Sequence, residues 1–156
     1  MESKRVQTAG WIDLRYHKRF NNFNQQTIQA TKELMLNWGA NTQEQNVIKM
    51  KKWLEKVAEI YQIQFPMLKI VQLAGAGYYR INKNQICMAY PSIVTLLHEF
   101  RHAMQFQNRT RVAGYSDKAE DDARAWSLSL YYKVAPRSFR RLVRQNQIMF
   151  VGTEDL

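Results

Sequence analysis

The chain has 156 residues, of which 46% are hydrophobic and 23% charged, a composition that excludes intrinsic disorder and suits a single domain over residues 1–156. Its longest apolar run is the five-residue stretch 93–97, far below the roughly 18 residues that a membrane span needs, and residues 1–10 contain no apolar leader, so we expect a cytoplasmic protein with no membrane contact. Lys and Arg number 23 against 13 Asp and Glu, and this net charge of +10 attracts polyanions without indicating which one is bound.

The first part of the chain predicts two helices after an N-terminal extension. Residues 1–23 form this extension, which is basic and aromatic and is densest in both at residues 15–20. From Asn24 onward, apolar residues recur at spacings of three and four, which predicts a helix that Gly39 stops. Thr42, with Gln45 three residues later, makes a capping box for a second helix.

The middle of the chain predicts a small antiparallel sheet. Residues 68–73, 78–81 and 85–89 are short apolar runs, and the asparagine-rich residues 82–84 favour a hairpin between the last two. We expect three antiparallel strands, with residues 85–89 as an exposed edge that an extended substrate can join. Cys87 is the single cysteine of the chain, so an internal disulfide is excluded. It lies in the last run and is expected to be a buried hydrophobic residue.

The last third of the chain predicts three more helices. Ser92 is the expected N-cap of a helix to about residue 107, and a second helix runs over residues 117–134 until Pro136 stops it. Residues 138–147 are expected to form a short terminal helix with Arg140, Arg141 and Arg144 on its outer face. The order of helices, small sheet and helices predicts one α+β domain.

The chemical signal lies in the first of these helices, where His98, Glu99 and His102 stand in the pattern HExxH. Two histidines four residues apart project from one helix face, where they can share a metal ion. Glu99 lies about 100° around the helix, where it can take a proton from a metal-bound water without being a ligand. The alternative is a pair of ordinary surface or core histidines. Only three histidines occur in the chain, and two of them fall here.

A catalytic zinc needs a third protein ligand, and the acidic cluster Glu120, Asp121 and Asp122 begins 18 residues after His102. With about 100° per residue, Glu120 lies about 60° from the centre of the apolar face of its helix, Asp122 about 100° and Asp121 about 160°. We therefore expect Glu120 to be the ligand and Asp122 to hydrogen-bond a liganding histidine. The alternative is that all three acids only complement the helix N-terminus. His17 lies far upstream in the basic extension.

Three tyrosines are candidates for stabilising a developing oxyanion. Tyr115 is the first, because it lies in the loop between the two ligand-bearing helices, and Tyr78 and Tyr79 are weaker candidates. A packing role is the alternative for each, since the chain has 8 tyrosines.

The segment 98–103 (HEFRHA), followed by 120–126 (EDDARAW), resembles the ImmA/IrrE-like group of compact gluzincin zinc metallopeptidases. The resemblance implies a zincin-like fold, Zn²⁺ held by His98, His102 and Glu120, and Glu99 as the general base. The chain departs from the group at Asp122, where a glutamate is usual, and at Arg124, where larger gluzincins have an aspartate. A weaker resemblance is to SprT-like proteases, whose third histidine ligand and cysteine zinc ribbon are missing here.

Two functions follow from these patterns. The first is a zinc metalloendopeptidase, a hydrolase that cuts a protein or peptide substrate inside the cell. The second is a basic, nucleic-acid-associated binding protein with a non-catalytic or structural zinc site. The net charge, residues 15–20 and the arginines of the last helix favour it, whereas a simply solvated surface is the alternative for those charges. The arginines are Arg137, Arg140, Arg141 and Arg144.

Overall fold

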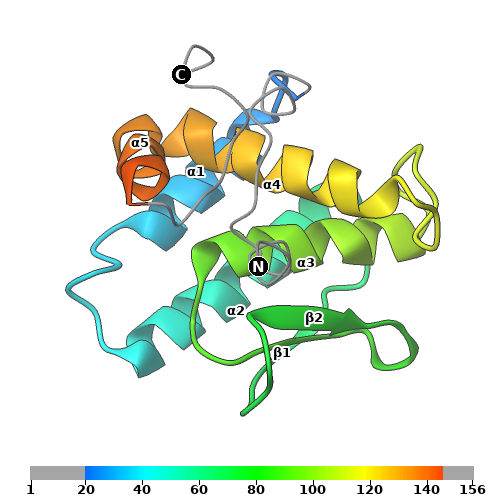
Figure 1. Cartoon of the computed structure of the whole chain (residues 1–156), viewed down its shortest axis with the longest axis horizontal. Helices are drawn as coiled ribbons and strands as arrows, with labels where there is room; N and C mark the ends of the chain where they lie inside the picture. The colour runs from blue at the N-terminus through cyan, green and yellow to red at the C-terminus, as the bar shows by residue number, and fades with distance from the viewer. Residues whose placement is uncertain (1–19, 146–156) are drawn as a thin grey trace, which may run out of the picture.

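A computed structural model describes residues 20–145, which form five α-helices and a three-stranded sheet (Figure 1). The predicted α+β class is confirmed. In chain order the elements are α1 (Gln25–Met35), α2 (Gln43–Tyr61), β1 (Met67–Ile70), β2 (Gly77–Arg80), a 3-10 turn η2 (Ile81–Lys83), β3 (Gln85–Met88), α3 (Ile93–Phe106), α4 (Ala119–Val134) and α5 (Pro136–Arg144). Residues 1–19 of the predicted extension, including His17, and residues 146–156 lie outside the described range.

The local signals for helix starts are confirmed. Thr42 and Gln45 form the predicted reciprocal capping box at the start of α2, and the Ser92 hydroxyl accepts the backbone N–H of Thr95 at the start of α3. The end of α1 differs from the prediction. The helix stops at Met35, and the left-handed residue after it is Asn37 (φ 59°) and not Gly39, since asparagine tolerates this conformation.

The sheet is mixed, with strand order β1-β3-β2, and the prediction of a wholly antiparallel sheet is wrong. The β2–β3 hairpin is antiparallel as expected, but β1 pairs with β3 in parallel. The physical reason is burial: Ile86, Cys87 and Met88 of β3 are all buried, whereas Met67 of β1 is 60% exposed. The strand with the most buried side chains takes the centre, where it pairs with both neighbours.

This order also corrects the expected substrate edge. Residues 85–89 lie at the centre of the sheet, and the two edges are β1 and β2. Any strand added to this sheet must therefore pair with β1 or β2.

Helix α3 lies in the middle of the molecule, between the sheet on one side and α4 on the other (Figure 1). Leu96, Leu97 and Phe100 are buried on its apolar faces, and Phe100 packs edge-on against Trp53 of α2. Gly77 brings β2 close to α3, because a Cβ atom there would lie 2.7 Å from Cγ2 of Thr95. The core therefore fixes α3 on several sides.

Within residues 20–145, no helix combines the length and the apolar character that a bilayer span requires. Two aromatic residues at the start of this range pack near α3 and α4. The Phe20 ring lies 5.1 Å from the Arg101 guanidinium carbon, and Phe23 packs edge-on against Trp126.

Candidate metal centre

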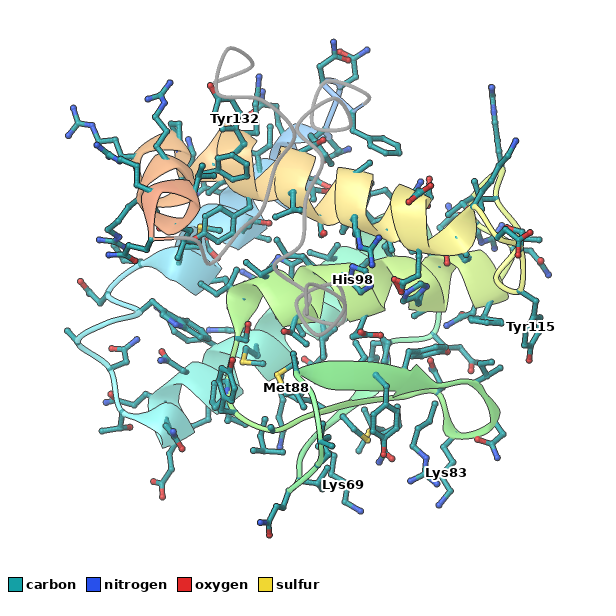
Figure 2. All side chains as sticks on the ribbon, viewed as in Figure 1. Lys69, Lys83, Met88, His98, Tyr115 and Tyr132 are labelled. Carbon is teal, nitrogen blue, oxygen red and sulfur yellow. The ribbon has the colours of Figure 1, made fainter. Side chains whose placement is uncertain are left out.

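The HExxH residues lie on α3, where His98 and Glu99 are nearly fully buried, at 4% and 6% exposure. Figure 2 shows His98 on the side of α3 that faces α4. Burial of two polar residues on an apolar helix is costly unless partners compensate for the lost water.

Glu120, in the first turn of α4, completes a triangle of ligand atoms with the two histidines. Its Oε1 atom lies 3.1 Å from Nε2 of His98 and 2.9 Å from Nε2 of His102, and the two Nε2 atoms are 3.2 Å apart. The structure thus brings together the three ligands expected from the sequence. The Glu120 side chain is 51% exposed, so one side of the triangle is open to water.

The triangle has the dimensions of a tetrahedral metal site. Zinc bonds of about 2.0–2.1 Å place neighbouring ligand atoms about 3.3 Å apart. The observed 2.9–3.2 Å is slightly tighter. Two imidazole nitrogens and one carboxylate oxygen form a donor set that catalytic zinc sites use.

Gln105 fixes which nitrogen of His102 faces this triangle. Its amide nitrogen donates to the Ala119 carbonyl oxygen and to Asp122 Oδ2, both at 2.9 Å, and neither oxygen has a proton to give back. Its Oε1 atom therefore faces His102 Nδ1, at 2.8 Å, and must accept the N–H from that nitrogen. In the neutral ring, Nε2 then carries a lone pair that points at the Glu120 carboxylate.

Two acceptors facing each other at 2.9 Å repel unless a cation or a proton lies between them. Without a metal ion, a proton on His102 provides that positive charge. Burial opposes the charged ring, but the hydrogen bond and charge of Glu120, together with the charge of Glu99, raise the pKa of His102 overall. Burial likewise opposes the Glu120 carboxylate, yet hydrogen bonds from both histidines lower its pKa well below the usual range. The cluster thus favours a bound positive charge.

These shifts predict how zinc affinity depends on pH. Zinc must displace the proton of His102, whose raised pKa lies above the ordinary 6.5, while Glu120 stays ionised. Below the raised pKa of His102, displacement of this one proton is expected to lower zinc affinity with a slope that approaches about tenfold per pH unit. Competition titrations with a chromogenic chelator, from about pH 8 to about pH 6, measure this slope. An affinity that does not change over this range would contradict displacement of a proton from His102.

Glu99 has the environment of a general base. Burial raises the pKa of its carboxyl group, and the nearby charge of Glu120 adds to the increase, although the two histidines oppose it. None of the described residues donates a hydrogen bond to its carboxylate. A raised pKa lies closer to neutral pH, and a base with such a pKa both accepts and releases protons efficiently.

Asp122 differs from its prediction. It forms no hydrogen bond with either histidine; it accepts two from the Arg101 guanidinium, at 2.8 and 3.3 Å, and one from Gln105. At 3% exposure it is also far more buried than Glu120, contrary to the order that helical phase predicted. The reason is that α4 packs against α3, α1 and α5, so its buried arc is wider than one apolar face.

Arg101 and Gln105 are site residues that the sequence reasoning missed. Arg101 is buried and donates two hydrogen bonds to Asp122, and its guanidinium carbon lies 5.1 Å from the centre of the Phe20 ring and 5.5 Å from that of Trp126. The available signal for Gln105 was its position three residues after His102, which places it one turn further on the same face. Arg101 donates to Asp122, Asp122 accepts from Gln105, and Gln105 in turn contacts Nδ1 of His102.

His98 lacks comparable support. Within the described residues its buried Nδ1 atom has no hydrogen-bond partner, and neither has the buried Nε atom of Arg124. Arg124 lies one helical turn after Glu120, at the position where the sequence departs from the larger gluzincins. His102 is therefore the histidine whose orientation is the better fixed.

The three candidate tyrosines lie elsewhere. Tyr115 is 82% exposed, its ring packs edge-on against Phe106, and it lies in the loop between α3 and α4, away from His98 (Figure 2). Tyr79 stacks on Phe106 and donates to Asn84, and Tyr78, whose pKa is raised by a hydrogen bond with Cys87, is on β2. The structure brings none of them into the ligand triangle, and an oxyanion role for Tyr115 stays a prediction.

Replacing Gln105 with leucine tests the support of His102. The change keeps the size of the side chain but removes the acceptor for Nδ1–H, so zinc affinity is expected to fall by about 10- to 100-fold. Zinc titration measures this loss, and thermal unfolding of the zinc-free variant reports any separate effect on folding. Wild-type affinity in a folded variant would show that Gln105 does not orient the ligand.

Comparisons with protein-family models, with curated proteins and with solved structures find no match to this chain.

Proposed function

We propose that this chain is a zinc-dependent peptidase of the gluzincin type, with His98, His102 and Glu120 as ligands. The observation that carries the proposal is the triangle of ligand atoms at 2.9–3.2 Å with Glu99 on the next position of the same helix. A zincin-like arrangement of α3, α4 and the edge strand β2 is part of the proposal.

Zinc bound there would lower the pKa of a water molecule and polarise the substrate carbonyl. The residues of the chain supply the rest. Glu99 takes the proton of the attacking water and passes it to the leaving amine, and its raised pKa suits both transfers. Gln105 keeps the Nε2 lone pair of His102 directed at the site. The partly exposed side of Glu120 leaves room for water and substrate.

The position of β2 supports a protein or peptide substrate. β2 is an edge strand, and Gly77 at its start lies against Thr95, which is one helical turn before Glu99 on α3. An extended peptide paired with the free edge of β2 would run along the face of α3 that carries Glu99. This edge replaces residues 85–89 in the substrate hypothesis.

A purely structural zinc site is the second candidate, and the ligand set disfavours it. Structural zinc sites are closed by four protein ligands. Within residues 20–145, three His, Glu, Asp or Cys residues converge here, and no fourth joins them. A binding protein with vestigial zinc remains the outcome if no hydrolysis is found.

Metal removal and restoration test the proposal. Purified protein is analysed for zinc, treated with a chelator, and incubated with an unstructured protein substrate before and after zinc is restored. We expect cleavage by the zinc-loaded protein, loss of at least about 90% of it on chelation and recovery with one equivalent of zinc. A protein that holds zinc but cleaves nothing would be consistent with the metal site but would overturn the peptidase proposal.

A further inference from the structure

Helix α5 has two chemically opposite faces. Phe139 and Val143 are buried against the core. The other face consists of exposed arginines at spacings of three, four and seven from the first, so all of them lie on one side of the helix. We call this set the α5 arginine face; it is made of Arg137, Arg140, Arg141 and Arg144.

The positive charge of this face is not compensated by acidic residues in the preceding part of the chain or by ion pairs. Residues 123–145 contain six Arg or Lys residues and no Asp or Glu. Within the described residues, no arginine of the face forms an ion pair: Arg140 contacts the Tyr132 hydroxyl and ring, and Arg141 contacts Ser138. Helix α2, by contrast, carries three glutamates together with its four lysines, and Lys56 pairs with Glu33.

We propose that the α5 arginine face binds the phosphate backbone of nucleic acid. Guanidinium groups bind phosphates through two parallel hydrogen bonds, and neighbours on one helix face lie about 5–6 Å apart, so adjacent arginines can engage different phosphates. Such binding depends on charge and requires no base contact.

The chemistry of the face disfavours the other polyanionic partners. An anionic membrane is usually bound by a helix that inserts apolar side chains, whereas Phe139 and Val143 are already buried in the core. A protein interface usually has an apolar centre, and the face presents arginines alone. Phosphate contacts need neither feature.

This surface is separate from the metal centre. Glu120 and Val134 lie at opposite ends of α4, about 21 Å apart at 1.5 Å per residue, and α5 follows Val134 (Figure 1). The proposal therefore does not depend on zinc or on peptidase activity.

The test compares two double variants that remove the same charge. Arg137→Gln/Arg144→Gln removes the two arginines whose guanidinium groups have no hydrogen bond or ion pair with a described residue. Lys51→Gln/Lys52→Gln removes two exposed lysines of α2. The affinity of each for a 20-base-pair DNA duplex and for the matching RNA duplex is measured by fluorescence anisotropy at about 50 to 200 mM salt.

We expect the α5 variant to bind duplex DNA about tenfold more weakly at low salt and its log–log salt slope to fall by about 1.8, the value for two lost phosphate contacts. The α2 variant is expected to keep the wild-type slope. Equal losses of affinity in both variants would assign the effect to net charge. Unchanged affinity in the α5 variant would show that the face does not bind nucleic acid. Either result overturns the proposal. It is also overturned if wild type binds anionic vesicles but neither duplex.

Discussion

Replacing Glu99 with glutamine is expected to reduce peptide hydrolysis by about a hundred- to ten-thousandfold while zinc content stays at the wild-type level. The amide has nearly the same size as the carboxyl group but cannot accept the proton of the attacking water. Because Glu99 is not among the three ligand atoms, the triangle of His98, His102 and Glu120 is left intact. Initial rates of cleavage of an unstructured protein, paired with metal analysis of the same samples, measure the two effects separately.

The matched control for this change is Glu55→Gln on α2, which makes the same substitution at an exposed position. It is expected to cleave at the wild-type rate. If Glu99→Gln cleaves as fast as this control, the base has been assigned to the wrong residue. If its zinc content falls, the variant has disturbed the site and a loss of rate no longer reports on proton transfer.

Replacing Glu120 with alanine is expected to weaken zinc binding by roughly a thousandfold or more, and activity is expected to disappear with the metal. Two histidines alone leave an incomplete donor set. A second effect occurs without metal, because Glu120 supports the raised pKa of His102. That pKa is therefore expected to fall in the variant, and titration of the His102 ring by NMR measures the change.

Asp121→Ala is the control, since it removes the same charge from the same helical turn. Asp121 lies about 100° around α4 from Glu120, and its one ion pair among the described residues is a 3.9 Å contact with Arg124. We expect its zinc affinity to stay within about threefold of wild type. Equal losses in the two variants would mean that the acidic turn acts through its overall charge and that Glu120 is not a ligand.

The parts of the fold that depend on neighbouring residues were predictable from the sequence. The cap at Thr42 is recognised from Gln45 three positions later, and Ser92 is recognised as a residue type that favours the N-cap. The HExxH spacing places both histidines on one face by helix geometry alone. Glu120 was also predicted as the acid that faces the histidines, since the chain between α3 and α4 is long enough for α4 to return beside α3, although helical phase misjudged the burial of Asp122.

Non-local competition decided what the sequence did not predict. The central place of β3 depends on which strand best buries its side chains, and a hairpin signal between β2 and β3 carries no information about β1. Asp122 is buried because α4 is covered on more than one side, and a prediction that assumed one apolar face placed it too far from the core. Spacing places Gln105 on the same face of α3 as His102, but its role also depends on Ala119 and Asp122 of α4, which no spacing within α3 reveals.

The position of bound zinc tests the central claim most directly. Anomalous diffraction from a zinc-loaded crystal locates the ion without assumptions about activity. We expect one site per chain, about 2.0–2.2 Å from Nε2 of His98, Nε2 of His102 and a carboxylate oxygen of Glu120. Zinc at another location, or a triangle that stays free of metal at saturating zinc, would contradict the proposed centre.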